Sequence, residues 1–257
     1  MTDYPTMIAQ VNRMEPVPRR IRAMLGGRVV LDTIRAMYLW ESPKYPQYYI
    51  PLDDIDATAV IDESHVQRLS RGTARRIGLR AGDVDRAGAG RVYTEDSLPG
   101  LAGLARLNWD SLDAWFEEDE QVFVHPRNPY TRVDALRSTR HVRIGLDGVL
   151  LAETSSAVLV FETGLPTRYY VNRTEVDFTA LRPSPTVTEC PYKGRTTEYW
   201  SAQIGDAVHE DLAWSYAFPS AALLPMAGLV SFYNEAVDIH VDGVLRERPV
   251  THLRKVP

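Results

Sequence analysis

Cysteine and lysine are both scarce in this sequence of 257 residues. Cys190 is the only cysteine, which excludes an intramolecular disulfide and any zinc site of the four-cysteine type. Lys44, Lys193 and Lys255 are the only lysines, and the rest of the 29 basic residues are arginines. This bias is typical of a GC-rich bacterial genome, and it draws attention to each lysine.

The sequence also has no excess of basic over acidic residues. The net charge is −5 and the isoelectric point is near 5.7, which disfavours nucleic acid as a partner because binding to phosphates needs clustered Lys and Arg. No apolar run approaches the roughly 18 residues of a membrane span, and Met1 to Glu15 does not resemble a secretory signal. We therefore expect a cytoplasmic protein with no membrane partner.

The sequence contains an internal repeat. A shift of about 121 positions aligns Ile21–Asp56 with Val142–Asp177 without a gap, and nine of the 36 aligned residues are identical. Chance would give roughly two identities. The repeat predicts two tandem domains of one fold, which we place at residues 16–130 and 131–257.

Each half has a β pattern, in which short β-branched and aromatic runs alternate with turn signals. Val142–Leu146 and Val149–Glu153 flank Asp-Gly, a sequence typical of a two-residue hairpin turn. Thr197–Ile204 and Ala207–Trp214 flank Gly-Asp and predict a second hairpin, whereas Ala221–Met226 is compatible with a short helix. The fold class is therefore predicted to be mainly β.

The first half diverges after about Asp62. Leu98–Phe116 reads as longer and more helical than its counterpart in the second half. Glu117–Glu120 is a run of four acidic residues, which is typical of a solvated helix end.

Three motifs in the second half identify a family. Phe161–Tyr170 reads FETGLPTRYY, Cys190–Gly194 reads CPYKG and Trp214–Tyr216 reads WSY, and together they resemble the signature of the domain-of-unknown-function 427 family. The first half resembles a diverged copy of the same domain.

The resemblance implies a β-tent fold, in which small antiparallel sheets with short helices meet at an angle. Zinc holds many such tents together, but this chain lacks paired Cys-x-x-Cys motifs, so we expect no metal and no cofactor. A nucleotidyltransferase-like label is sometimes attached to the family. The sequence offers it no support, because it has neither a glycine-rich phosphate loop nor a paired Asp motif.

Cys190 and Lys193 are candidates for chemistry. Pro191 holds Cys190 in an extended conformation, and a cation such as Lys193 or Arg168 would stabilise the thiolate, which is the reactive form of cysteine. Glu162 or Tyr192 could then move a proton. The alternative is that Cys190 is a small packed residue and Lys193 a solvated charge.

Glu162 ends an apolar strand, and Glu41 occupies the same place in the first half. A carboxylate at that position needs a partner, and Arg168, across the turn, could supply a bidentate bond to it. The alternative is an ion pair that only closes the hairpin.

Aromatic residues complete the candidate site. We expect Tyr170, Tyr192, Trp214 and Tyr216, together with Arg168, to line a small-molecule pocket beside the candidate catalytic residues Cys190, Glu162 and Lys193. The alternative function is a non-catalytic structural or protein-interaction module, in which these residues only stabilise turns and the core.

Overall fold

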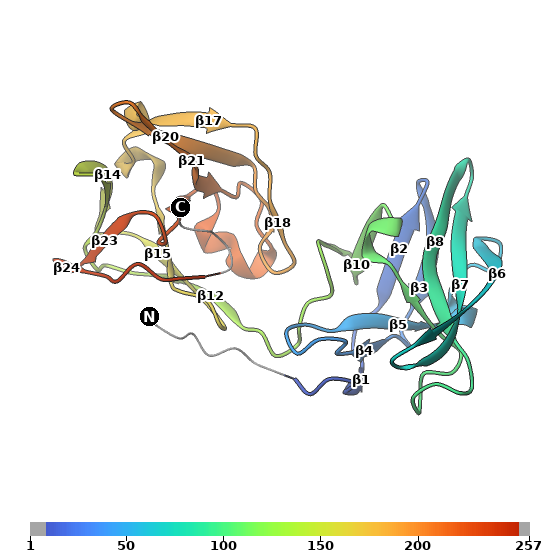
Figure 1. The fold of residues 1–257 in the computed structure, drawn as a ribbon. Helices are drawn as coiled ribbons and strands as arrows, with labels where there is room; N and C mark the ends of the chain where they lie inside the picture. The colour runs from blue at the N-terminus through green and yellow to red at the C-terminus, as the bar shows by residue number, and fades with distance from the viewer. Residues whose placement is uncertain (1–8, 252–257) are drawn as a thin grey trace. The chain divides into compact units, whose positions relative to one another are not determined.

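The computed structural model describes residues 9–251, and these fall into an N-terminal unit, residues 9–128, and a C-terminal unit, residues 129–251 (Figure 1). Strands account for 51% of the described residues and helices for 7%, so the fold is mainly β, as predicted. The helices are short. They are η1 (Leu52–Asp54), η2 (Trp109–Ser111), η3 (Arg173–Glu175), η4 (Phe178–Ala180) and η5 (Ala221–Met226).

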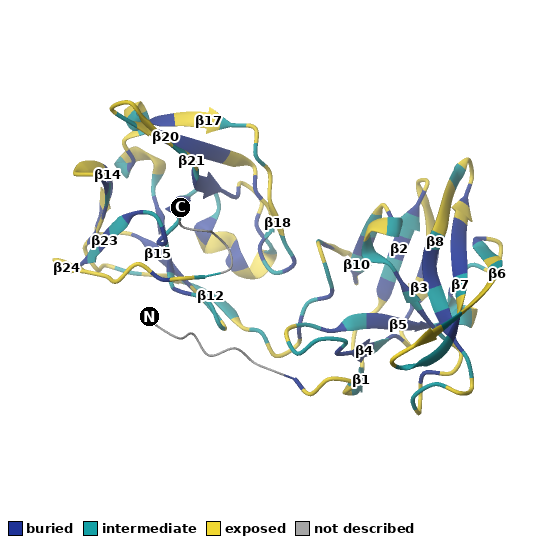
Figure 2. Cartoon of the chain, in the orientation of Figure 1, coloured by how far each residue is buried: buried dark blue, intermediate teal, exposed yellow. Residues whose placement is uncertain are grey.

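The N-terminal unit has two antiparallel sheets. The larger one contains, in spatial order, β1 (Met14–Pro16), β4 (Met37–Leu39), β5 (Gln47–Pro51), β9 (Leu104–Leu107), β8 (Val84–Tyr93), β7 (Gly72–Ala81) and β6 (Val60–Leu69). The smaller one contains β11 (Glu120–Val122), β10 (Ala114–Glu117), β2 (Ile21–Leu25) and β3 (Arg28–Thr33). The edge strand β6 has no buried residue, whereas β7 and β8 each have buried stretches (Figure 2).

The C-terminal unit repeats this arrangement. Its larger sheet contains, in order, β12 (Val133–Arg137), β15 (Val158–Glu162), β16 (Arg168–Val171), β22 (Val230–Phe232), β21 (Ala207–Ser215), β20 (Glu198–Ile204) and β17 (Leu181–Ser184). Its smaller sheet contains β14 (Val149–Thr154), β13 (Val142–Leu146), β23 (Asp238–Val241) and β24 (Val244–Leu245). A separate hairpin pairs β18 (Glu189–Cys190) with β19 (Gly194–Arg195).

The two larger sheets have the same strand order along the chain, so the sequence repeat corresponds to a repeat of topology. The predicted hairpins are confirmed. At the turn between β13 and β14, Asp147 and Gly148 have φ angles of 49° and 82°, the left-handed values that a two-residue hairpin turn requires. Turn chemistry therefore fixes where these strands begin and end.

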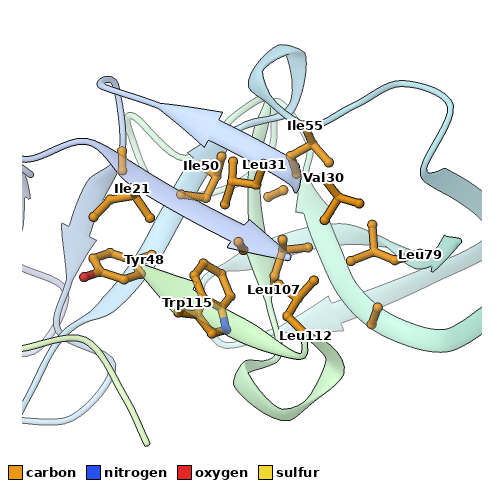
Figure 3. Close-up of a cluster of buried hydrophobic side chains, with 14 of the residues drawn as sticks. Ile21, Val30, Leu31, Tyr48, Ile50, Ile55, Leu79, Leu107, Leu112 and Trp115 are labelled. Atoms are coloured by element: carbon orange, nitrogen blue, oxygen red, sulfur yellow. The ribbon is translucent and has the colours of Figure 1, made fainter. Parts of the chain in front are cut away.

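A hydrophobic core lies between the two sheets of each unit. In the N-terminal unit the smaller sheet contributes Ile21 from β2 and Trp115 from β10, and the larger sheet contributes Ile50 and Leu79 (Figure 3). Val142, Ile144, Val230 and Phe232 belong to the corresponding core of the C-terminal unit. A second buried cluster in each unit involves other side chains of the larger sheet, and the candidate site lies beside one of these clusters.

Two sequence predictions for the first half are wrong. Leu98–Phe116 is not a helix, because it contains β9, the short η2 and the start of β10. Trp115 and Leu107 bury their side chains in the core from these strands, so tertiary packing overrides the local helix preference.

The acidic run is also not a solvated helix end. Glu117 and Glu120 pair across the β10–β11 hairpin, and the Glu117 side chain is 2% exposed. Glu117 accepts a hydrogen bond of 2.7 Å from the Tyr48 hydroxyl and forms an ion pair with Arg19. One member of the run is therefore a buried structural carboxylate, and strand alternation is what turns it inward.

No helix in the described part of the chain is long and apolar enough to cross a membrane.

Candidate functional site

One face of the larger C-terminal sheet carries several of the predicted site residues. Because side chains alternate along a strand, Glu162 shares a face with Val160 on β15, and Arg168 shares one with Tyr170 on β16. Trp214 on β21 belongs to the same buried cluster as Tyr170. The full cluster contains Val158, Val160, Tyr170, Tyr199, Trp214, Tyr216, Leu223 and Met226.

Glu162, Lys193 and Cys190 meet at the edge of this cluster. The ammonium of Lys193 forms an ion pair with the Glu162 carboxylate, and each of the two side chains is 10% exposed. The Sγ atom of Cys190 lies 4.0 Å from Lys193 Nζ. The structure therefore brings a thiol, an ammonium and a carboxylate together from segments that are 31 residues apart in the chain.

The β18–β19 hairpin places Lys193. Cys190 pairs with Gly194 across the hairpin, and the φ angle of Gly194, 99°, allows the tight reversal between them. Ser220 holds the turn: its amide donates to the Lys193 carbonyl at 3.1 Å, and its hydroxyl donates to the Tyr192 carbonyl at 2.7 Å. The Tyr192 side chain is half-buried in this turn.

Lys193 is a charged group at neutral pH. Burial alone would lower the pKa of Lys193, but the neighbouring Cys190 and Glu162 outweigh it and raise that pKa above its ordinary value. A protonated Lys193 cannot act as a nucleophile or a general base. Its chemical contribution is a positive charge held beside the thiol.

The buried tyrosines of the predicted site, Tyr170 and Tyr216, are hydrogen-bond donors rather than bases. Burial raises the pKa of Tyr170 to about 12, although Lys193 acts in the opposite direction. Burial likewise raises the pKa of Tyr216 well above its ordinary value. Trp214 donates its indole N–H to the Tyr170 hydroxyl at 3.2 Å, so Trp214 and Tyr170 also hold each other in place.

Arg168 does not pair with Glu162, and that prediction is wrong. Its guanidinium forms two bonds of 2.7 Å to the Glu235 carboxylate and one of 3.1 Å to Asn234. Tyr170 pairs with Ser231, so Arg168, two residues back on β16, lies level with the turn that follows β22. Glu235 is in that turn and is fully buried, which makes it the carboxylate within reach.

Glu235 and Ser231 are two residues of this face that sequence reasoning missed. The sequence analysis did not single out Asn234–Glu235, which lies in a turn rather than in a strand. Ser231 stands between Tyr170 and Trp214 in the strand register. Its hydroxyl is fully buried and has no hydrogen-bond partner within the described residues.

Residues 9–251 contain no group of three or more His, Cys, Asp or Glu side chains arranged to bind a metal. Arg168 is instead flanked by aromatic rings, with its guanidinium carbon 5.8 Å from the Trp214 ring centre and 5.6 Å from that of Tyr233. The site therefore consists of charged pairs set against aromatic side chains.

Comparison with known proteins identifies the family and no more. No curated protein matches the sequence. The family model described as a domain of unknown function (DUF427) matches twice, over residues 13–118 and 134–243. The two matches cover most of the chain and agree with the repeated strand order. The chain belongs to the DUF427 family and contains two copies of its domain in tandem.

Proposed function

We propose that the C-terminal domain carries a small-molecule binding or enzymatic site built on Glu162, Cys190 and Lys193. The observation that carries this proposal is the 4.0 Å approach of the Cys190 thiol to the buried ammonium of Lys193. A neighbouring positive charge stabilises a thiolate, and the thiolate is the nucleophilic form of cysteine. Glu162 holds the ammonium in position.

The surrounding groups suit a bound polar molecule. Cys190 is only partly buried, and we propose that a ligand reaches its sulfur. Protonated Tyr170 and Tyr216 belong to the cluster beside it, and Ser231 adds a hydroxyl that lacks a partner within residues 9–251. An unpaired buried hydroxyl costs about 1–3 kcal/mol, so a group that reached it would be favoured. We propose Arg168 and Trp214 as fixed walls of the site.

A structural role is the second candidate. It is favoured by the two bonds from Ser220, which fasten the hairpin turn to the start of η5, and by the Lys193–Glu162 pair, which fastens it to β15. In that role the ion pair would stabilise the domain without binding any ligand.

The reactivity of Cys190 tests the thiol chemistry. We expect iodoacetamide to alkylate Cys190 in the native protein about tenfold faster than in the Lys193→Met variant, because the variant lacks the cation that stabilises the thiolate. The protein has a single cysteine, so mass spectrometry of the intact chain reports the rate directly.

Arg195→Met is the matched control, because Arg195 lies on the same hairpin but is exposed and pairs with Glu189 at 3.8 Å. Its alkylation rate should equal that of the native protein. Equal rates in the native protein and Lys193→Met would show that the ammonium does not activate the thiol.

Ligand-induced stabilisation separates the two roles. A ligand that binds only the folded state raises the melting temperature, so a screen of small metabolites should yield a shift in the native protein that is lost in Glu162→Gln and Cys190→Ser. The structural role would be favoured if no metabolite stabilised the native protein and if the Glu162→Gln variant were less stable than the native protein.

A further inference from the structure

The N-terminal unit carries a cluster of arginines at the place that corresponds to the C-terminal site. Arg71, Arg91 and Arg106 surround Glu41, and we call these four residues the arginine cluster. Arg91 Nη2 and Arg106 Nε each lie 3.3 Å from Glu41 Oε1, and Arg71 donates to the Glu41 backbone carbonyl at 3.0 Å. The Tyr49 hydroxyl donates to the same carboxylate oxygen at 2.8 Å.

The repeat shows which positions of the C-terminal site correspond to the residues of the arginine cluster. Glu41 aligns with Glu162, and Arg71 precedes Gly72 as Lys193 precedes Gly194. Arg106 follows Ala105, the partner of Ile50, and therefore stands where the C-terminal sheet has Ser231.

Arg91 pairs with Arg106 in the register, as Trp214 pairs with Ser231. The N-terminal face thus has two arginines where the C-terminal face has a serine and a tryptophan. This copy of the site has not lost its polar character but has become strongly cationic.

The cluster carries more positive than negative charge. Three guanidinium groups lie around one carboxylate: Arg91 and Arg106 contact it directly, and Arg71 contacts the Glu41 backbone carbonyl. Among residues 9–251 these arginines contact no other carboxylate. Burial alone would raise the pKa of Glu41, but Arg106, Tyr49 and Arg91 outweigh it and lower that pKa, so Glu41 is ionised at neutral pH. Two positive charges remain uncompensated.

The cluster is sheltered but accessible. The side chains of Arg91, Arg106 and Glu41 are 23%, 14% and 23% exposed, so solvent screens their charges less than it screens charges on an open surface. Tyr93 supports one side, because the Arg91 guanidinium carbon lies 5.9 Å from its ring centre and Arg91 Nε donates to its hydroxyl at 3.2 Å. The arginines are therefore held in place before any ligand arrives.

Each guanidinium keeps one terminal nitrogen unused within the described part of the chain. Arg71 uses Nε on Asn12 and Nη2 on Glu41, which leaves Nη1. Arg91 leaves Nη1 in the same way, and Arg106 leaves Nη2 because its Nη1 donates to Leu107 and Asn108. Each of the three arginines thus keeps a charged donor group for a ligand.

We propose that the arginine cluster binds a doubly charged oxyanion, the phosphate group of a small molecule. A phosphate dianion matches the two uncompensated charges, whereas a carboxylate ligand would neutralise only one. Guanidinium groups bind phosphate oxygens through charge-assisted hydrogen bonds, and partial burial strengthens those bonds. This proposal does not depend on the chemistry proposed for Cys190.

Titration of the full-length protein with inorganic phosphate tests the proposal. At constant ionic strength, calorimetry should show saturable binding that weakens at least tenfold, on the order of one lost charge-assisted contact, in Arg106→Met and in Arg91→Met. Arg75→Met is the matched control, because Arg75 is on the neighbouring strand in an exposed pair with Asp62 and should leave phosphate affinity unchanged. Circular dichroism confirms that each variant is folded.

A gain of affinity provides an independent check. Glu41→Gln removes the carboxylate that competes with the ligand for the guanidinium donors, so phosphate should bind roughly threefold to tenfold more tightly. Acetate should bind more weakly than phosphate in every variant. Binding that Arg75→Met weakens as much as Arg106→Met, acetate binding as tight as phosphate binding, or no saturable phosphate binding would each overturn the proposal.

Discussion

Replacing Arg168 by methionine should lower the free energy of unfolding of the C-terminal domain by about 4 kcal/mol. Arg168 and Glu235 have side chains that are 7% and 0% exposed, and two hydrogen bonds of 2.7 Å join them. Without Arg168, Glu235 is a buried carboxylate with no cation. Removing one partner of a buried pair costs far more than removing both, because the remaining charge is neither solvated nor paired.

Hydrogen exchange followed by mass spectrometry locates the loss, since only peptides of the C-terminal domain should exchange faster. The double variant Arg168→Met/Glu235→Leu is the control, and it should recover most of the lost stability. If the double variant is as unstable as Arg168→Met, the packing of the arginine side chain rather than its charge holds this turn.

The same pair predicts a pH dependence. Burial alone would raise the pKa of Glu235, but hydrogen bonds and charge from Arg168 outweigh it and lower that pKa. The stabilisation from the pair is therefore complete above the unfolded-state pKa of about 4.3, and it is lost as the pH falls from there through the lower folded-state pKa. Chemical denaturation at a series of pH values should show a steeper acid loss for the native protein than for Glu235→Gln, and parallel curves would contradict the assignment.

Local chemistry made much of the fold predictable. The strands around Asp147-Gly148 were predictable because a two-residue turn sets both their ends and their register. The repeat was visible because positions such as Tyr49 and Tyr170 are buried in both copies. Where local preference and packing disagree, as at Trp115, prediction failed, because the chain follows the core rather than its helix propensity.

Some features of the candidate site were likewise predictable from the sequence, and others were not. Glu162, Cys190 and Lys193 stood out as unusual residues, and the fold brings them together. The partner of Arg168 could not be predicted, because Glu235 is 67 residues away and the contact depends on how β16 pairs with β22. Likewise, Arg91 and Arg106 meet only because β8 pairs with β9, so the sequence alone presents them as ordinary arginines.

Gly72→Ala should destabilise the N-terminal domain by about 4 kcal/mol, from backbone strain and overpacking together. Gly72 has a φ angle of 117°, which disfavours any side chain, and a Cβ atom there would lie 2.3 Å from the Cα of Ser97 and 2.8 Å from the carbonyl oxygen of Asp96. The loop cannot move aside cheaply, because Ser97 Oγ donates to the Thr73 carbonyl at 3.0 Å and Leu98 N donates to the Arg71 carbonyl at 2.9 Å.

The second copy of the domain supplies the matched control. Gly194 occupies the equivalent position with a φ angle of 99°, but a Cβ atom there would meet nothing closer than the Phe218 carbonyl oxygen at 3.6 Å. Gly194→Ala should therefore cost only the backbone strain, about 1 kcal/mol. Denaturant unfolding with hydrogen exchange measures both variants, each in its own domain. Equal losses would mean that strain alone sets the cost and that the loop at Asp96–Ser97 moves aside to make room for the Cβ atom.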